Sequence, residues 1–569
     1  MNVLEMEDHS NVSTIASATI TFPDELMSGA ELIARSIEEI ANKDAVVMGV
    51  PGSPITEIID WLENNSCKKG MAGWIDFGEV NMVRQLIGAN SHGRQTIAVM
   101  KHTGFFKIQE LISTMTNHDL NAPMVLIIGD EPGAGSQNGN DSRFLCDSSY
   151  LPIVEPSFQN IPDCFFYCLD LSARLRKPVV LRVVPALTDT LRCLNDCTRH
   201  FSPSLMRCQS SYRDYYASEA LVIGRYLRTK SLLHRLRLGD YKPGPLNQIF
   251  QKNSKKLVVA AGATADRVKD IISELDEIDL LEINTVNGFP QDIVKNTFDR
   301  YESVLILESW EPYLEQHIRG LCQQLQVRDI RVFGREQGVD GLSDNAYLAG
   351  DYSEENIAQI LISFQDHDVP KNLARLPCVN HAFANTDDHR YPYIFESFSK
   401  AAQFYGKTPV FSVSTGRTRY AVMNTPYEKF VKFMGPMGSE TMTLVGYLDY
   451  APVKEELAAC LVIGDYTFLH SSWSGLSLLN KRRIERKGKI PTILIKNGGS
   501  LTTGGQLCAP PEETGSKLVV NWKKRYLGSV SVENISAMEE SMKILINNNT
   551  PEDILVVSMI DLPTLEKFH

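Results

Sequence analysis

Short apolar runs that alternate with amphipathic segments constrain this chain more than any other feature of its sequence. Runs rich in valine, isoleucine and leucine recur from residue 44 to residue 558, and stretches with helical periodicity separate them. Strands that are apolar along their whole length are buried on both faces, and parallel neighbours need a crossover segment, usually a helix. The pattern therefore predicts an α/β protein built from doubly wound parallel sheets.

The apolar runs fall into three groups along the chain. They are residues 44–50, 96–102, 122–130 and 177–185, then 255–268, 279–290 and 302–309, then 408–416, 459–465, 489–499 and 552–563. An amphipathic helix is predicted over residues 27–41, with Ser28 as its N-cap. The stretch 200–253 shows no clear strand and is predicted to be a linker with helical pieces.

Composition excludes several classes of protein. The net charge of −12 does not favour non-specific binding to nucleic acid. No apolar run reaches the roughly 18 residues that a transmembrane helix needs, so no membrane partner is expected. The N-terminus is acidic and polar and lacks the pattern of a signal peptide, which predicts a cytoplasmic protein.

A lone carboxylate follows one of the predicted buried strands. The strand over 459–465 ends in Gly464 and Asp465, and the next predicted strand ends at Asn497. Asp465 is either a metal ligand or an ordinary cap of the following helix. If the two strands are neighbours, both side chains lie at their carboxyl ends, where open α/β sheets bind ligands. A carboxylate, an amide oxygen and the backbone carbonyl of Gly499 would suit Mg²⁺.

The spacing from Gly-Asp to Asn resembles the thiamine diphosphate signature. The segments "GDYTFLHSSWSGLSLLN" and "ILIKNGGSLTTGGQ" are similar to the diphosphate domain of the indolepyruvate ferredoxin oxidoreductase α-subunit, and so is "FMGPMGSETMTLVGYL". They also resemble the phosphonopyruvate and sulfopyruvate decarboxylases. The resemblance implies an enzyme that uses thiamine diphosphate and Mg²⁺, with Asp465, Asn497 and Gly499 as metal ligands.

The other parts of the chain resemble the same family. "MGVPGSPITEIIDWL", "WIDFGEVNMVRQLIGANSHG", "VMKHTGF" and "GDEPGAGSQNGNDSRF" are similar to its pyrimidine-binding domain, and "VVAAGATADRVKDIISEL" to its transketolase-C-like domain. The implied organisation is a pyrimidine domain at 20–200, a linker at 201–254, a transketolase-C-like domain at 255–370 and a diphosphate domain with a C-terminal extension at 371–569. The family's cofactor lies between two such domains, commonly across a dimer, so a homodimer is expected.

The resemblance assigns roles to individual residues. Glu79 would activate the cofactor by hydrogen bonding to its aminopyrimidine ring, while His102 and His470 would donate protons or contact substrate. Ser53, Thr56 and Arg419 would bind the substrate. The remaining cofactor contacts would be Pro51, Gly52, Thr415, Gly416, Gly435, Met437, Gly438, Gly464, Tyr466, Thr467, Leu501 and Thr502. Glu79 could instead be a surface glutamate at a helix start, and His102 and His470 could be structural histidines. Ser53 and Thr56 could be turn and cap residues, and Arg419 an exposed arginine.

Departures from the family pattern bear on the reaction. The sequence has no cysteine after Cys508, and it keeps only Cys378 and His381 of a Cys-Pro-x-Cys-Pro-His run that the family often shows. The loop "VSTGRTRYAVMN" resembles that of the decarboxylases. We therefore expect non-oxidative decarboxylation or carboligation of a 2-oxo acid. The resemblance to indolepyruvate enzymes suggests an aryl side chain, and the arginine loop an anionic one.

Two alternatives stay open beside this reaction. One is the catalytic subunit of a 2-oxo acid oxidoreductase whose electron carrier is on another chain, and the other is a non-catalytic scaffold.

Overall fold

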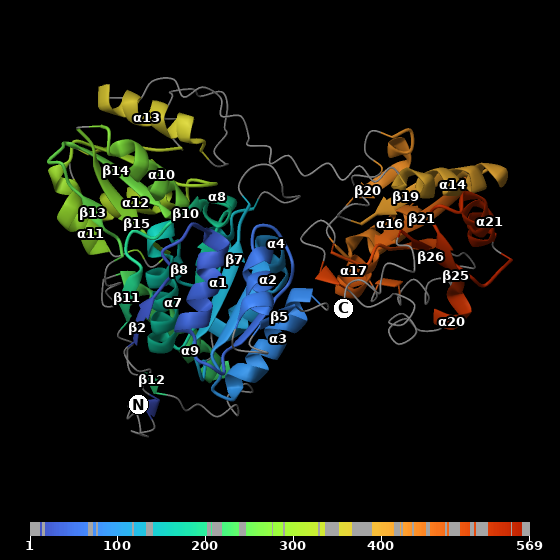
Figure 1. The fold of residues 1–569 in the computed structure, drawn as a ribbon, viewed down its shortest axis with the longest axis horizontal. Helices are drawn as coiled ribbons and strands as arrows, with labels where there is room; N and C mark the ends of the chain where they lie inside the picture. The colour runs from blue at the N-terminus through green and yellow to red at the C-terminus, as the bar shows by residue number, and fades with distance from the viewer. Residues whose placement is uncertain are drawn as a thin grey trace. The chain divides into compact units, whose positions relative to one another are not determined.

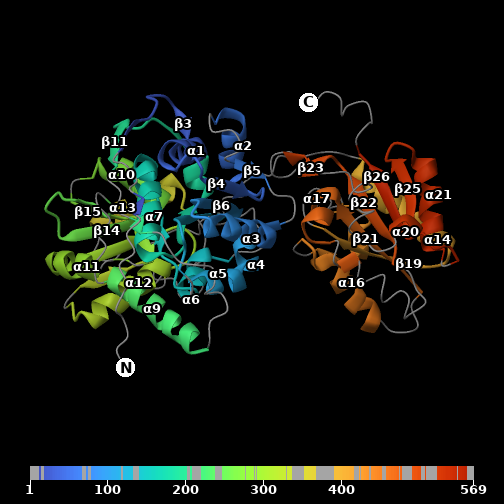
Figure 2. The same cartoon turned by 90° about the horizontal axis from the view of Figure 1, so that it is seen from below.

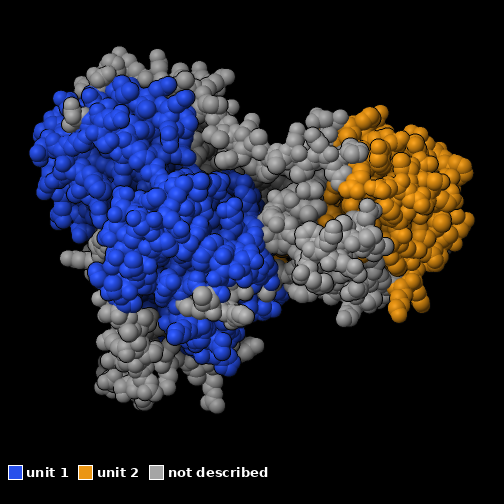
Figure 3. Space-filling view, in the orientation of Figure 1, with its two compact units in different colours: residues 1–75, 79–381 blue, residues 76–78, 382–569 orange. Residues whose placement is uncertain are grey.

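The structure consists of two compact units. The computed structural model describes residues 12–13, 18–66, 72–74, 78–116, 119–131, 140–201, 206–207, 219–237, 246–275, 277–287, 289, 291–327, 330–335, 352–366, 390–414, 422, 425–434, 437–450, 456–472, 475–476, 490–500, 506–507, 522–547 and 549–559. Unit 1 comprises residues 1–75 and 79–381, and unit 2 comprises residues 76–78 and 382–569 (Figure 3). The predicted division into four segments stays a prediction.

The first sheet of unit 1 is almost entirely parallel. Seven of the described strands form it, in the order β16-β8-β9-β7-β6-β4-β5. They are β4 (Val46–Gly49), β5 (Ala72–Trp74), β6 (Thr96–Lys101), β7 (Met124–Gly129), β8 (Ile153–Val154), β9 (Val179–Val183) and β16 (Thr285–Asn287). Only the pairing of β16 with β8 is antiparallel among these strands. The edge strand β16 comes from the middle of the chain.

Helices cover both faces of this sheet (Figure 1). Helices α1 (Gly29–Ile40), α2 (Thr56–Asn65) and α7 (Ile161–Leu175) share one hydrophobic cluster with Val99 and Ile127 of the strands. Helices α3 (Gly78–Ser91), α4 (His102–Lys107) and α5 (Gln109–Thr116) share another with Met100 and Ile128. Successive strand residues point to opposite faces, which is why runs without polar residues are needed here. The predicted N-cap is confirmed, because Ser28 Oγ accepts the Glu31 N–H at 3.0 Å.

The second sheet of unit 1 packs against the first. Five described strands form it in the order β13-β15-β14-β17-β18. They are β13 (Ile249–Phe250), β14 (Lys256–Ala261), β15 (Asp279–Ile283), β17 (Ser303–Leu307) and β18 (Arg331–Phe333). One face packs on α10 (Gly262–Ile272) and α13 (Glu354–Asp366). The other face shares a hydrophobic cluster with the first sheet and with α12 (Tyr313–Gln324), so the two sheets have a common core.

Shorter elements complete unit 1. They are β1 (Val12–Ser13), β2 (Ala18–Thr21), β3 (Met27–Ser28), α6 (Ser142–Ser148), α8 (Pro185–Thr188), β10 (Leu191–Arg192), β11 (Thr198–Phe201), β12 (Met206–Arg207) and α11 (Gln291–Thr297). The unit also contains the longer helix α9 (Glu219–Arg237). The prediction that residues 200–253 hold no strand is wrong, since β12 and β13 lie there. Each has two residues, too few to show an alternating pattern, whereas the predicted helical piece is present as α9.

A buried network of charges joins the two sheets of unit 1. Arg143, at 0% exposure, donates hydrogen bonds to Asp141, to Glu308 at 2.6 Å and to the Ser309 carbonyl at 2.8 Å. Burial alone would raise the pKa of Asp141, but the guanidiniums of Arg143 and Arg182 lower it below its usual range. Burial raises the pKa of Glu308, although Arg143 opposes the shift. Asp141 precedes α6 and Glu308 follows β17, so the network connects the first sheet's loops to the second sheet.

Unit 2 contains the third sheet. Six described strands form it in the order β20-β19-β21-β22-β26-β25, and all their pairings are parallel. They are β19 (Thr408–Val413), β20 (Val431–Met434), β21 (Leu457–Gly464), β22 (Thr492–Lys496), β25 (Tyr526–Ser531) and β26 (Ile554–Ser558). One face packs on α14 (Tyr391–Phe404) and α21 (Ile535–Ile546), and the other on α16 (Ser439–Tyr450) and the turn Phe468–Ser472 (Figure 1).

The shorter elements of unit 2 are α17 (Asp465–Thr467), β23 (Gly499–Ser500), β24 (Gln506–Leu507) and α20 (Trp522–Arg525). Most of the crossover helix predicted between β21 and β22 lies outside the described residues. The three largely parallel sheets confirm the predicted α/β class. Within the described part of the chain, no helix combines the length and apolarity needed to cross a membrane.

Asp266 of α10 gives a pH-dependent prediction. Burial raises its pKa to about 6, although its carboxylate accepts the Phe158 N–H at 2.6 Å. Because the folded state then binds this proton more tightly than the unfolded state, stability falls as pH rises from about 4 to about 6. We expect Asp266→Asn to be more stable than wild type at pH 7.5, by about 2–3 kcal/mol, with the gap shrinking towards pH 4. Urea unfolding at both pH values measures this.

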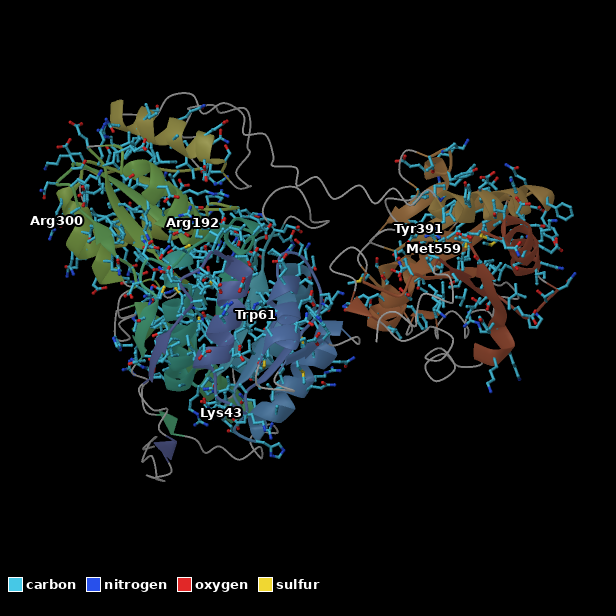
Figure 4. All side chains as sticks on the ribbon, in the orientation of Figure 1. Lys43, Trp61, Arg192, Arg300, Tyr391 and Met559 are labelled. Carbon is cyan, nitrogen blue, oxygen red and sulfur yellow. The ribbon has the colours of Figure 1, made fainter. Side chains whose placement is uncertain are left out.

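The control for this prediction is Asp270→Asn on the same helix. Asp270 is exposed and pairs with Arg192, which is labelled in Figure 4. Loss of such a surface pair costs up to about 1 kcal/mol and should not reproduce the pH trend. A gap for Asp266→Asn that widens as pH falls would contradict the assignment.

Candidate active site

Several predicted site residues lie together at the carboxyl edge of the first sheet. Pro51 and Gly52 follow β4, His102 follows β6, and both Pro51 and Gly52 are buried. A methyl group at Gly52 would lie 3.0 Å from Lys101 Cβ, and one at Gly129 would lie 2.6 Å from Ile55 Cγ2. The turn after β4 therefore packs directly on the ends of β6 and β7, where the Lys101 and Ile55 side chains leave little room for a Cβ at either glycine.

Thr56 holds this turn together. Its Oγ1 accepts the Gly52 N–H at 3.0 Å and lies 3.2 Å from the Gly52 carbonyl, to which it can donate. Thr56 is buried and Ser53 half-buried. The local contacts of Thr56 are those of the turn residue named as its alternative, and substrate binding by Ser53 and Thr56 stays a prediction.

Glu79 lies in the first turn of α3 and is 5% exposed, so the alternative of an ordinary surface glutamate is wrong. Its Oε2 is 3.8 Å from Lys107 Nζ. A methyl group at Gly104 would lie 2.6 Å from the carboxyl carbon of Glu79. The glycine of the "MKHTGF" segment thus leaves room for the glutamate, a relation between two residues that the sequence analysis did not foresee.

His102 is fully buried beside the same strand ends. Its Nδ1 lies 3.3 Å from the Gly129 carbonyl, and its ring packs edge-on against Trp310 with centroids 5.7 Å apart. Trp310 follows β17 of the second sheet. The His102 ring is thus held between the end of β7 and the Trp310 indole. The predicted role of His102 towards substrate stays a prediction.

In unit 2, the structure brings Asp465 and Asn497 together. β21 and β22 pair in parallel, with Gly464 opposite Ile495. Asp465 is 1% exposed, and its Oδ2 accepts the N–H groups of Asn497 at 3.0 Å and Gly498 at 2.8 Å. Gly464, not Asp465, is the N-cap of α17. Asp465 Oδ1 also accepts the Tyr466 N–H at 2.8 Å in the first turn of α17, so the Asp465 carboxylate connects the two strand ends as well as the start of this helix.

The donor set around Asp465 fits a magnesium ion. A carboxylate, the Asn497 carboxamide and the Gly499 carbonyl are hard oxygen ligands of the kind that Mg²⁺ prefers. Asn497 Nδ2 donates to the hydroxyl of Tyr391 at 3.2 Å, which fixes the orientation of the amide (Figure 4 labels Tyr391). No group of three or more His, Cys, Asp and Glu residues within the described ranges could hold a metal. A metal here would thus rely on the mixed oxygen set.

Glu440 is a buried carboxylate that the sequence analysis missed. It is 0% exposed, its Oε2 accepts the Gly438 N–H at 2.8 Å, and its Oε1 accepts a short hydrogen bond from Ser472 Oγ. It therefore connects the turn after β20 to the turn after Asp465. Acidic residues are common in the first turn of exposed helices, so the sequence alone gives no sign of this role.

Gly438 has a positive φ of 93°, and a methyl group there would lie 2.8 Å from Ser471 Cβ. Glycine is therefore required at this position. Its N–H donates to Glu440, and the predicted role of Gly438 as a cofactor contact stays a prediction. Met437, beside it, is half-buried.

His470 is 6% exposed and lies in the turn after α17. Its Nδ1 is 3.1 Å from Ser471 Oγ, and its ring is tilted against that of Tyr466 with centroids 6.0 Å apart. Tyr466 and Thr467 are also buried. The predicted contacts that lie outside the described residues are Thr415, Gly416, Arg419, Gly435, Leu501 and Thr502.

Gly104 and Gly88 form a matched pair for testing the contact with Glu79. Both are helical glycines, but a methyl group at Gly88 meets no atom within 4 Å. Alanine is the better helix former, so Gly88→Ala should stabilise the protein by about 0.5–1 kcal/mol. We expect Gly104→Ala to destabilise it by about 1–3 kcal/mol, because the methyl group displaces the buried carboxylate. Urea unfolding gives both values.

A double-mutant cycle isolates the cause. In a Glu79→Ala background, Gly104→Ala should lose its destabilising effect, since the atoms it meets are gone. An unchanged cost in that background would show that the methyl group collides elsewhere.

No protein-family model matches this chain. Indolepyruvate oxidoreductase subunit IorA of Methanothermobacter marburgensis is 23% identical over 487 residues, which cover 82% of this chain and 75% of the relative. IorA of Pyrococcus horikoshii is 23% identical over 541 residues, covering 89% and 80%. A similarity of this extent is longer than either unit and therefore includes residues of both.

Among solved structures, 2-oxoglutarate:ferredoxin oxidoreductase from Magnetococcus marinus aligns at 10% identity with a TM-score of 0.43. The alignment covers 59% of this chain and 64% of that chain, a likeness too distant to carry an argument. The expected resemblance to phosphonopyruvate and sulfopyruvate decarboxylases stays a prediction.

Proposed function

Because the chain is a homologue of the indolepyruvate oxidoreductase α-subunits along most of its length, we propose that it is the catalytic subunit of a 2-oxo acid oxidoreductase. The similarity to these subunits carries the proposal. It favours oxidation over the non-oxidative decarboxylation that the sequence analysis ranked first. The cofactors are thiamine diphosphate and Mg²⁺, the substrate is a 2-oxo acid with an aryl side chain, and a homodimer is the expected assembly.

The residues described above would hold the cofactor in two groups. Asp465, Asn497 and Gly499 would hold Mg²⁺, and Glu79 would hydrogen bond to the aminopyrimidine ring. Bound thiamine diphosphate supplies the electron sink that decarboxylation of a 2-oxo acid requires. The buried setting of Glu79 supports its role, because a carboxyl removed from water exchanges a proton only with a group placed directly beside it.

Residues next to Glu79 and in the turn after β4 would shape the surroundings of the reacting groups. Gly104 gives the Glu79 carboxyl its space, and Lys107 places a positive charge 3.8 Å from it. Thr56 and Gly52 fix the turn whose Ser53 would meet the substrate carboxylate. His102 and His470 are both buried next to strand ends and would move protons at their ring nitrogens.

Non-oxidative decarboxylation is the second candidate. An iron–sulfur cluster needs four thiolates, and in ferredoxins these come from closely spaced cysteines. The eleven cysteines of this chain are scattered from Cys67 to Cys508, and no two have the C-x-x-C spacing. The oxidoreductase proposal therefore includes an electron carrier on a separate chain.

Acceptor dependence of CO₂ release tests the proposal. The purified chain is incubated with thiamine diphosphate, Mg²⁺ and a panel of 2-oxo acids, with and without an artificial electron acceptor. We expect release that requires the acceptor and that falls by about 100-fold or more in Glu79→Gln, since general acid–base groups contribute about 10²–10⁴-fold. The exposed Glu110→Gln on α5 is the matched control and should keep wild-type activity.

Two other results would contradict the oxidoreductase proposal. Release without acceptor that is lost in Glu79→Gln would establish the decarboxylase instead. No release, together with a melting temperature that Mg²⁺ and cofactor leave unchanged, would overturn both and favour a non-catalytic scaffold.

A further inference from the structure

A cavity of about 370 Å³ lies in unit 1, away from every residue assigned to the cofactor. Residues of α9, α11, α12 and the edge strand β16 line it, and the three helices are labelled in Figure 2. Its volume is within the range of sites that bind small molecules. Arg237 and His317 form the charged part of its lining, here called the charged wall. Val286, Phe289 and Leu321 form the apolar part, and three glutamines and a glycine complete the lining.

The charged wall contains a histidine whose two ring nitrogens both face hydrogen-bond acceptors. His317 Nδ1 lies 2.8 Å from the Tyr313 carbonyl, and its Nε2 lies 3.1 Å from Asp147 Oδ2. The Tyr313 carbonyl and an ionised Asp147 carboxylate both accept hydrogen bonds, so this geometry favours the doubly protonated ring of His317. Burial would lower the pKa of His317, but hydrogen bonds to Asp147 and Tyr313 raise it above its usual value.

Arg237 supplies the second positive charge of the wall. Its Nη2 lies 3.1 Å from Asn287 Oδ1 and 3.5 Å from Asp147 Oδ1. Nε and Nη1 have no partner among the residues that the structure describes. Asp147 balances one of the two positive charges, which leaves a net charge of about +1 on this wall. A guanidinium with unused donors matches the two oxygens of a carboxylate or phosphate.

The rest of the cavity is suited to an apolar group. Val286 and Phe289 are buried and form its floor with Leu321. Gly320 faces open space, because a methyl group there would meet no atom within 4 Å. An apolar body of modest size can therefore lie over α12 next to the charged wall.

We propose that this cavity binds a small organic anion, with its carboxylate or phosphate group on Arg237 and its apolar body on Val286, Phe289 and Leu321. Arg237 orients the anionic end, and the His317 imidazolium adds charge without offering a free nitrogen. The site is independent of the proposed reaction, since none of its residues belongs to the cofactor groups around Glu79 and Asp465.

Calorimetric titration of the full chain tests the site, without thiamine diphosphate so that the result does not depend on the proposed function. The probes are benzoate, phenyl phosphate and the neutral benzyl alcohol. We expect at least one anion to bind, and benzyl alcohol to bind at least tenfold more weakly. Preference between the two anions identifies the acidic group of the ligand.

Two variants test the volume of the cavity and its positive charge separately. Gly320→Leu fills it and Arg237→Gln removes its fork of donors, so each should weaken anion binding by tenfold or more. Leucine is the better helix former, and unfolding by urea should show Gly320→Leu to be at least as stable as wild type. The control Arg235→Gln lies exposed on the same helix outside the lining and should bind as wild type.

Three results would overturn the proposal. They are the absence of binding by both anions, equal binding of benzyl alcohol, and wild-type affinity in both Gly320→Leu and Arg237→Gln.

Discussion

The buried contact between Arg143 and Glu308 is the constraint on which unit 1 depends. Removing one partner of a buried ion pair leaves an uncompensated charge and typically costs about 3–5 kcal/mol. Arg143 comes from the start of α6 after the first sheet's β7, and Glu308 from the end of β17 in the second sheet. Asp141 forms an ion pair with Arg143, and Asp130, directly after β7, forms one with Arg182 of β9. These ion pairs hold Asp130 and Asp141 in place after β7. The carboxyl edge that carries Gly52 and His102 is thereby tied to the middle of the chain.

In unit 2, buried carboxylates also connect chain segments that are far apart in sequence. Asp465 and Glu440 are buried carboxylates. Asp465 accepts hydrogen bonds from residues after β21 and after β22, and Glu440 accepts them from residues after β20 and after β21. A buried carboxylate is stable only when its oxygens are satisfied, so each one forces the segments around it into a fixed geometry. In both units the acids gather where parallel strands end. The same sheet topology that buries apolar strands thus collects rigid polar groups along one edge, where a ligand can use them.

The strands and the Asp465–Asn497 pair could be predicted from the sequence because their signals are local. Apolar runs mark buried parallel strands, and a polar residue directly after such a run must lie at a sheet edge. Ser28 was predictable for the same reason, since capping needs only nearby residues. The contact of Arg143 with Glu308 joins residues 165 positions apart and leaves no pattern in either segment. β13 escaped notice because two residues in an antiparallel edge show no periodicity, and β16 was not separated from β15 within the apolar run 279–290.

The reaction itself was the least predictable step, for a chemical reason. A decarboxylase and an oxidoreductase of this kind share the loss of CO₂ and differ only in where the remaining electrons go. In the proposed function Glu79, Asp465 and Asn497 would serve the shared half, so their arrangement favours neither outcome. The second half depends on an electron acceptor, and the scattered cysteines place that acceptor outside this chain if oxidation occurs. Similarity to oxidoreductase subunits along most of the chain therefore weighs more than the expected similarity of the short segment 413–424 to the decarboxylases.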